Sequence, residues 1–417
     1  LRFGLKFIAE VPEPDGTVSW GGIEADFKKL MSYEDFIARL GPLKREEDTI
    51  PRIKYLDKHF HGTGFNLVAL LEAADVIRSR DPKLAAKAVK VAKRAWEWMN
   101  TQPMEKSHDY GVYLYAASEL NRRFPSERFV SRIDTAVEKL LELQSLDPAK
   151  IANGAIGNFF YSPAERNFHF QYKFTSFNIA IHLALIRLEE DLPHSHPLWP
   201  KIRCANQIFA RQYLPTMSDL TPYGQIAHGL EPDTAGIFHP KYFSGKAGER
   251  AAAAFHGLNC DHFGYAYVAM KYAQLTGDVG LETFADDQAQ WALGKNPLGY
   301  CMMAGAGSVN PVHMSAFFDK GPIPGEIPNG IVSGNAETEE PEWWGEGPSS
   351  GEDWMPHNSY YLSLIPELDR DAGLTLRVTR NGQPVSGTAA VLREDGETIA
   401  SLKLENGVIA PVSLTPQ

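Results

Sequence analysis

Apolar residues recur at helical spacing through most of the first 290 residues. Residues 64–79, GFNLVALLEAADVIRS, show this period, and residues 83–100 combine it with many Ala and Lys residues, which favour helix. The same pattern is found in further segments: 108–124, 129–144, 174–190, 198–214, 262–277 and 281–294. The opening LRFGLKFIAE also has the pattern of a helix interior. The hydrophobic pattern therefore predicts a mainly α-helical chain.

Short links join several of these predicted helices. RSRDPK (78–83), RFPSER (123–128) and LTGDVG (275–280) each separate two long helical segments. Short links between long helices imply antiparallel hairpins, and a succession of such hairpins favours a toroid with alternating inner and outer helices. There is no βαβ rhythm and no glycine-rich phosphate fingerprint, so a nucleotide-binding fold is not predicted.

Two regions depart from the helical pattern. Residues 294–353 are rich in Gly, Pro, Asn and Ser but keep aromatic residues, which argues for an ordered, functional loop region. From about residue 371, apolar and polar residues alternate between the turn sequences RNGQ, EDGE and ENG, predicting a small module of about four strands. The expected organisation is a helical domain over 1–369 and an all-β module over 370–417.

Composition narrows the possible partners. The net charge of −11 argues against nucleic acid or an anionic membrane, because those surfaces select basic patches, and it is compatible with a neutral ligand such as a sugar. No run of about eighteen apolar residues predicts a membrane span. The three cysteines, Cys204, Cys260 and Cys301, are too far apart to suggest a disulfide framework or a metal knuckle.

Residues of types that often serve in catalysis or ligand binding cluster where the loop region ends and a predicted helix begins. The sequence GEDWMPHNSYY (351–361) places Glu352 and Asp353 beside Trp354, His357 and Asn358. An acid at this position is also favoured by the helix dipole alone, so a structural role for Glu352 is the alternative. Asp353 is interpreted as a helix N-cap or as a neighbour that sets the pKa of Glu352.

Four motifs in this order resemble glycoside hydrolase family 9, the inverting cellulases and their relatives. WALGKNPLG (291–299) resembles the family signature LGRNPLG, and the segments that resemble other family motifs are 304–314, 321–335 and 351–364. The similar order and spacing cover roughly residues 1–368. The resemblance implies an (α/α)6 barrel, in agreement with the toroid predicted from periodicity.

The resemblance also implies a site and a reaction. It places Glu352 on the family's catalytic glutamate and Asn358 on the family's asparagine. Inverting hydrolysis needs a carboxylic acid to protonate the leaving oxygen and a second carboxylate to activate water. Glu352 is the predicted acid, on a β-linked glucan or oligosaccharide. The predicted substrate-binding residues are aromatic rings and hydrogen-bonding groups: Tyr300, His313, Trp343, Trp344, Trp354, His357 and Asn358.

Two departures from the family pattern bear on this prediction. Met314 and Ser315 follow His313 where the family has an arginine, and no DAGD loop, which carries the family's catalytic base, is present. The base is therefore expected on an upstream segment, with the barrel incomplete at its N-terminus. The protein is expected to be secreted or periplasmic, with no required cofactor and a structural calcium that the sequence does not place.

Other functions remain open at this point. A carbohydrate-binding protein without catalysis would also lack the base loop. A polysaccharide lyase on a similar toroid would use residues such as His357, Asn358 and Tyr360, although the loop region offers only Lys295 and Lys320 to neutralise a uronic carboxylate.

Several polar groupings have simpler interpretations than a metal site. His59 and His61 form an HxH pattern that is interpreted as lining a barrel-end cleft, and Asp109 and Asp261 are interpreted mainly as helix caps. No metal-ligating set is predicted.

Overall fold

The chain is described by a computed structural model. It describes residues 2–10, 12–18, 59–125, 132–166, 168, 175–219, 223–243, 256–317, 321–333, 339–344, 349–353 and 355–369, and the strand residues 379–380, 383–384, 387–392, 398–405 and 408–409. Among the described residues, no helix is long and apolar enough to cross a membrane.

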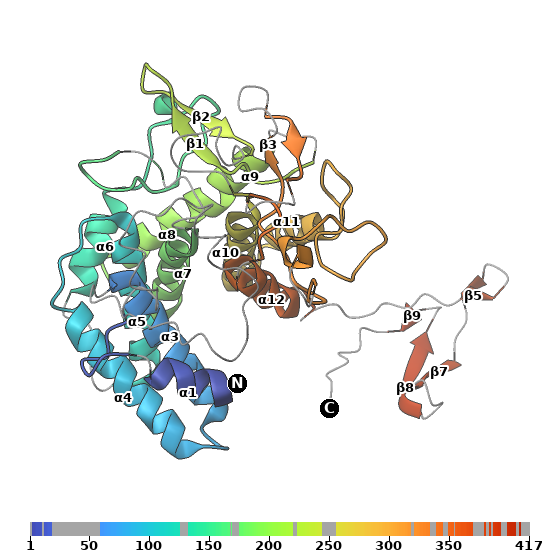
Figure 1. Cartoon of the computed structure of the whole chain (residues 1–417), viewed down its shortest axis with the longest axis horizontal. Coiled ribbons are helices and arrows are strands. Elements are labelled where there is room, and N and C mark those ends of the chain that lie inside the picture. Colours follow the sequence, from blue (N-terminus) through green and yellow to red (C-terminus); the bar gives the residue numbers. More distant parts are fainter. Residues whose placement is uncertain are drawn as a thin grey trace.

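The helices succeed one another as hairpins around an arc (Figure 1). In chain order they are α1 (Arg2–Glu10), α3 (Phe60–Ile77), α4 (Pro82–Met99), α5 (Ser107–Arg123), α6 (Ile133–Leu141), α7 (Thr175–Asp191), α8 (Trp199–Ile208), α9 (Leu214–Ser218), α10 (Asn259–Thr276), α11 (Val279–Ala289) and α12 (Met355–Asp369). A π-helical stretch, Phe209–Tyr213, joins α8 to α9. Short 3-10 helices cover Pro148–Lys150, Gln290–Ala292 and Met314–Phe317. The predicted mainly α fold is confirmed.

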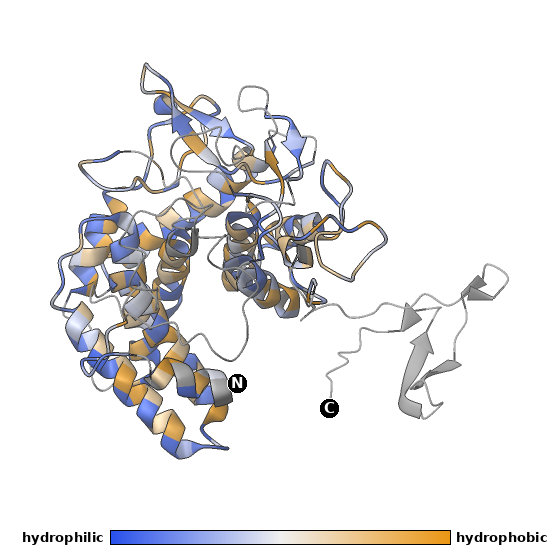
Figure 2. Cartoon of the chain, in the orientation of Figure 1, coloured by the Kyte–Doolittle hydropathy of each residue, from blue (hydrophilic) through white to orange (hydrophobic). Residues whose placement is uncertain are grey.

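Burial separates inner helices from outer helices. Helices α5 and α10 are buried on nearly every side, whereas α4 and α6 bury one stripe and expose the other. The stripe on α4 is mostly alanine, which lets it pack closely on α3. Figure 2 shows the corresponding mixture of apolar and polar residues along the outer helices. The inner helices α3, α5, α7, α10 and α12 pack against one another in that order.

Alternation of inner and outer helices gives all inner helices the same direction. Each outer helix reverses the chain, so the N-terminal ends of α3, α5, α7, α10 and α12 meet at one end of the arc. The loops that precede these helices therefore converge there. Side chains from many parts of the sequence therefore meet at this end.

Aspartates cap two of the helices, at positions for which the sequence analysis made no prediction, whereas the predicted cap Asp261 is wrong. Asp81 caps α4 and Asp278 caps α11 through their carboxylates. Asp261 is not a cap, because α10 begins at Asn259 and places Asp261 inside the first turn, where it is buried. Burial raises the pKa of Asp261 to about 8.

The strands are short and antiparallel. Strands β1 (Gly229–Pro232) and β2 (Phe238–Lys241) form a hairpin that the sequence pattern did not predict, and β3 (Val332–Ser333) pairs with β4 (Pro341–Glu342) in the loop region. In the tail the strands are β5 (Thr379–Arg380), β6 (Gln383–Pro384), β7 (Gly387–Leu392), β8 (Thr398–Glu405) and β9 (Val408–Ile409). They form a β5–β6 pair and a β7–β8–β9 sheet, so the tail contains strands where the alternation predicts them.

Candidate functional site

Glu352 lies on a short segment directly before α12, at the N-terminal end of the inner helices. Its backbone carbonyl accepts the N–H of Asn329 at 2.9 Å, and the carbonyl of Ser350 accepts the N–H of Gly330 at 3.0 Å. Helix α12 begins at Met355, so Glu352 precedes the helix and is not an acid of its first turn. Its side chain is 29% exposed, so a clamped backbone presents a carboxyl that solvent reaches.

A close contact between two glycines holds this segment. Gly257 lies so near Gly330 that an added Cβ would be 2.4 Å from the Gly330 carbonyl carbon and oxygen. The Gly257 N–H donates to the Ser349 carbonyl at 2.8 Å, and the Asn259 side-chain amide donates to the Pro328 carbonyl at 2.8 Å. The entry to α10 is thereby fixed against the segment that carries Glu352.

One buried histidine contacts Glu352, and a second buried histidine neighbours the first. The Nε2 of His256 is 3.6 Å from the Oε2 of Glu352, and the His256 side chain is only 4% exposed. His357 is buried on the first turn of α12, and burial together with the neighbouring His256 lowers the pKa of His357 to about 3. His357 is therefore neutral at ordinary pH. Its predicted contact with sugar stays a prediction.

Asp353 contacts His313 and does not cap α12. The Nδ1 of His313 is 3.0 Å from one Asp353 oxygen and 3.6 Å from a Glu326 oxygen. His313 is buried, and its Nε2 has no hydrogen-bond partner among the residues described. The N-cap interpretation of Asp353 is therefore wrong, because the carboxylate lies against a side chain from another loop.

Asn358 has a structural contact that the motif did not reveal. Its carboxamide oxygen accepts the Ile327 N–H at 2.9 Å, and its amide donates to the Ile327 carbonyl at 2.8 Å. One side chain thus satisfies both backbone groups of a buried residue and ties α12 to the loop that contains Glu326. A direct role of Asn358 in sugar binding stays a prediction.

Three of the four predicted aromatic residues lie within the described part of the chain. Tyr300 and Trp343 are partly buried and lie edge to face with ring centroids 5.9 Å apart, while the Trp343 indole N–H donates to the Val312 carbonyl at 2.9 Å. Trp344 is also partly buried, and its backbone N–H donates to the Ser350 hydroxyl. Trp354 lies outside the described residues.

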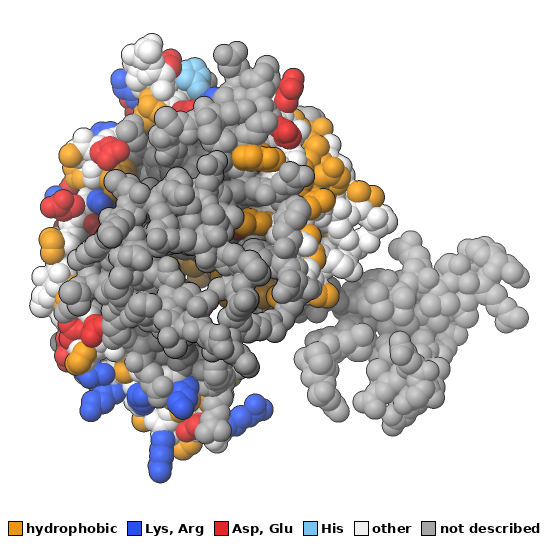
Figure 3. Space-filling model, viewed as in Figure 1, with side chains coloured by type: hydrophobic (Ala, Val, Ile, Leu, Met, Phe, Trp, Pro, Cys, Tyr) orange, Lys and Arg blue, Asp and Glu red, His pale blue; other side chains and the backbone are white. Residues whose placement is uncertain are grey.

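Apolar side chains are exposed on the loops that follow α11. Figure 3 shows them gathered on that part of the surface, and the large ones that are more than half exposed are Leu293, Val309, Val312 and Ile323. Apolar surface beside aromatic rings suits the C–H face of a pyranose.

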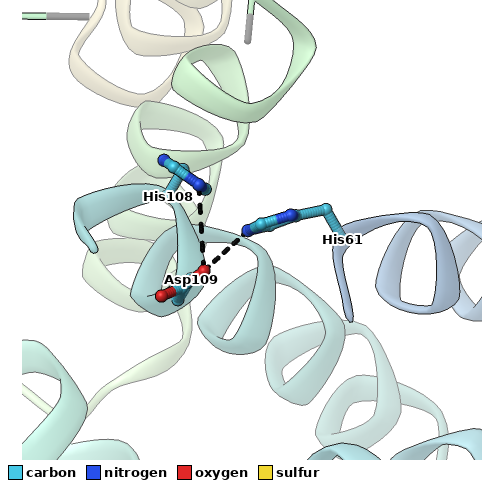
Figure 4. A group of neighbouring side chains, drawn as sticks. All are labelled: His61, His108 and Asp109. Carbon is cyan, nitrogen blue, oxygen red and sulfur yellow. Dashed lines mark hydrogen bonds and ion pairs between the residues drawn. The ribbon is translucent and has the colours of Figure 1, made fainter. Parts of the chain in front are cut away.

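A second group of polar side chains lies at the same end of the barrel. His61 from α3 and His108 from α5 both face the Oδ1 of Asp109, with Nε2–Oδ1 distances of 2.7 and 3.8 Å (Figure 4). The other Asp109 oxygen accepts the N–H groups of Lys106 and Glu105. Asp109 thus has the cap role that the sequence suggested, together with a place among barrel-end histidines.

The charge of this second group is already compensated. Burial acts to raise the pKa of Asp109, but the hydrogen bond with His61 and the backbone N–H of Lys106 outweigh it and lower the pKa to about 2. Burial and the neighbouring His61 lower the pKa of His59 to about 4. His61, His108 and Asp109 are residue types that bind metals, but the Asp109 carboxylate is stable here without a cation.

A cavity of about 290 Å³ lies elsewhere, between α5, α7 and α10. Its polar lining includes Arg187 and Glu190, near the C-terminal end of α7, and Lys271, near the C-terminal end of α10. Arg187 also pairs with Glu119, part of an ion network at that end. The cavity is therefore far along the helices from the loops that carry Glu352.

The sequence profile "Glycosyl hydrolase family 9" matches residues 1–342. The chain belongs to this family. A search of curated protein sequences found no match. The sequence resemblance to family 9 is thus confirmed over residues 1–342, a range that ends before Glu352 and α12.

Solved family 9 structures share the fold. A metagenome-derived family 9 endoglucanase is 16% identical with a TM-score of 0.55, and the match covers 88% of this chain and 60% of that one. A thermostable endoglucanase variant (D468A) from Alicyclobacillus acidocaldarius is also 16% identical, with a TM-score of 0.55 and coverages of 87% and 63%. A family 9 protein from Bacteroides ovatus is 15% identical, with a TM-score of 0.51 and coverages of 88% and 61%. The predicted (α/α)6 barrel class is confirmed by these neighbours, of whose length the chain spans about three fifths.

Some site residues were not found from the family motifs. Glu326 lies inside the motif-like segment 321–335 but was not predicted as a site residue, and neither were His256 and His108. Their common signal is position: His256 and His108 occur at the start of inner helices, and Glu326 lies in a Gly/Pro-rich loop. Side chains there converge in a family 9 barrel whatever their local sequence.

Proposed function

We propose that this family 9 protein is an inverting glycoside hydrolase that acts on a β-linked glucan or oligosaccharide, with Glu352 as the general acid. The observation that carries the proposal is the setting of Glu352. Its backbone is fixed by Asn329, while its carboxyl remains partly exposed at the end where the inner helices begin. A general acid needs this combination, because protonation of a leaving oxygen requires a fixed position and access to substrate.

Each neighbouring group has a role in this reaction. His256, 3.6 Å away, holds the Glu352 carboxyl on the substrate side of its segment. Tyr300, Trp343 and Trp344 provide aromatic surface for sugar rings, with Trp354 as a fourth candidate. The inverting reaction also requires a second carboxylate, which activates water on the opposite face of the sugar.

The substrate class follows from charge as well as from the family. The solved relatives named endoglucanases act on glucans, and this chain carries a net charge of −11. A neutral β-glucan suffers no repulsion from such a surface, whereas a uronic polymer would. Secretion or export to the periplasm is the corresponding localisation, because polymeric glucan lies outside the cell.

The decisive experiment compares Glu352→Gln with Glu97→Gln in the full-length protein. Glu97 is exposed on the outer helix α4 and serves as the matched control. Loss of a general acid lowers hydrolysis of cello-oligosaccharides by about 10²–10⁴-fold. Dinitrophenyl cellobioside, whose leaving group needs no protonation, should be hydrolysed nearly as fast as by the wild type.

Other results would contradict the proposal. Equal loss on both substrates would mean that Glu352 maintains structure or binds sugar, without acting as the acid. Unsaturated products that absorb in the ultraviolet would indicate a lyase. Binding of cello-oligosaccharides without turnover by the wild-type protein would indicate a carbohydrate-binding protein.

A further inference from the structure

Three loops that lack long helices bring their polar side chains to one point beside the candidate site. His313 precedes the 3-10 helix Met314–Phe317, Glu326 precedes β3, and Asp353 precedes α12. One ligand atom from each lies within 4.8 Å of the others. His313 is 2% exposed, and the two carboxyl side chains are 12% and 15% exposed.

The charges at this point are not balanced by the protein. In the part of the chain that the structure describes, no lysine or arginine forms an ion pair with Glu326 or Asp353, and the ionisable side chain that each contacts is His313. A neutral imidazole has one N–H and can donate it to only one of the two carboxylates. Two carboxyl side chains that are mostly removed from water and lie within 4.8 Å of each other form a setting that a bound cation would stabilise.

A buried carboxylate oxygen without a hydrogen-bond partner also favours a bound cation at this point. The second oxygen of Asp353 is buried and has no hydrogen-bond partner among the described residues. Glu326 accepts a hydrogen bond from the Ser315 hydroxyl at 2.5 Å, which orients its carboxyl toward His313. A buried carboxylate oxygen without a partner is costly unless a ligand satisfies it.

We propose that His313, Glu326 and Asp353 bind a divalent cation, Zn²⁺ or Mn²⁺. One imidazole nitrogen and two carboxylate oxygens form a donor set suited to these ions, whereas Ca²⁺ prefers oxygen ligands alone. Metal–ligand bonds of about 2.1 Å place neighbouring tetrahedral ligands about 3.4 Å apart. The distances of 3.0 and 3.6 Å from the His313 Nδ1 lie on either side of this value. The Ser315 hydroxyl does not contact the ion itself but orients the ligand Glu326 through its hydrogen bond.

The ion would fix the segment that carries Glu352 on the side opposite to the Glu352 carboxyl. Glu352 faces His256, while the next residue, Asp353, faces His313, because successive side chains of an extended stretch point to opposite sides. The Met314 N–H also donates to the Gly351 carbonyl at 2.7 Å. A metal ion here therefore cross-links three loops and positions Glu352, without contacting substrate.

The test measures metal directly and requires no turnover, so it is independent of the proposed hydrolysis. Tag-free protein is stripped with EDTA, dialysed, and titrated with Zn²⁺ and with Mn²⁺ by calorimetry, and metal content is measured by mass spectrometry. We expect one ion per chain and a rise in melting temperature on addition of metal. The isosteric variants Glu326→Gln and Asp353→Asn should each lower affinity at least tenfold while remaining folded in circular dichroism.

The chain offers its own controls. The double variant His61→Ala/His108→Ala removes the other group with metal-ligand chemistry, and His239→Ala removes an exposed histidine that pairs with Asp233. Both should keep the affinity of the wild type. The inference is overturned if stripped protein binds neither ion, if Glu326→Gln and Asp353→Asn bind as tightly as the wild type, or if only the His61→Ala/His108→Ala protein loses binding.

Discussion

Replacement of Gly257 by alanine tests whether glycine contacts hold the segment that carries Glu352. The new Cβ would be 2.4 Å from the Gly330 carbonyl carbon and oxygen and 2.5 Å from the Asn329 carbonyl oxygen. All three atoms belong to the backbone, so no side chain can rotate away. Normal contacts of this kind are at least 3.4 Å, and the loop must therefore move by about 1 Å.

The magnitude follows from overpacking. Forcing a buried backbone apart costs about 1–3 kcal/mol. With an unfolding entropy of about 2.1 cal/mol/K per residue over a unit of about 350 residues, that cost lowers the melting temperature by about 1–4 °C. The moving residues bond to the Glu352 segment, because Asn329 donates to Glu352 itself and Gly330 donates to Ser350. The rate of hydrolysis should therefore fall by more than the loss of stability alone would cause.

The assay combines differential scanning calorimetry with initial rates on cello-oligosaccharides. Gly4→Ala is the matched control, because Gly4 lies in α1 and an added Cβ there meets nothing within 4 Å. Alanine in that helix should leave the melting temperature unchanged or raise it slightly. If Gly257→Ala melted and hydrolysed like the wild type, the two backbones would not be in the tight contact on which this reasoning depends.

Three further changes test other parts of the structure. Asn358→Ala leaves both backbone groups of the buried Ile327 unbonded and should cost about 1–3 kcal/mol in urea denaturation, and a loss below 0.5 kcal/mol would contradict the clamp. Asp278→Ala removes the cap of α11 and should cost about 0.5–2 kcal/mol, with lower helicity as the second readout; an unchanged unfolding midpoint would exclude the cap role. Burial lowers the pKa of His182, stacked on Phe209, to about 3, below its unfolded value. The contribution of neutral His182 to stability is therefore complete above about pH 6.5 and is lost as pH falls toward 3, by up to about 1.4 kcal/mol per pH unit. The variant His182→Phe should reduce the decline in unfolding free energy measured between pH 7 and 5. A decline equal to that of the wild type would contradict the assignment.

Helix existence was predictable because it depends on local spacing. The periodic segment 83–100 became α4, displaced by one residue, since its alanine stripe leaves only one face to bury. The segment 198–214 was predicted as one helix, yet it contains a π-helical stretch at Phe209–Tyr213. Such a change of hydrogen-bond register has no periodic signal, because the side chains stay close to helical spacing. The β1–β2 hairpin was missed for a related reason, since its strands are only four residues long.

In the candidate site, too, the sequence identified individual residues but not their contacts. The family motif gave Glu352, and the structure places it at the inner-helix end, outside the first turn of α12. The motif also gave Asn358 but not its contact with Ile327. The sequence analysis interpreted Asp353 as a helix N-cap or as a neighbour that sets the pKa of Glu352, and the structure places its carboxylate against His313. These contacts join loops more than thirty residues apart, so no local pattern could encode them.

The sequence by itself determined the helical hairpins, the loop region and the acid at its end, because period, turn residues and motif order are local properties of the chain. Only the tertiary structure decided which side chains meet. Alternating inner and outer helices bring several N-terminal ends together, and this brings His256 to Glu352 and His61 to Asp109. The physical reason is that burial and charge balance depend on neighbours in space, which the order of residues alone does not specify.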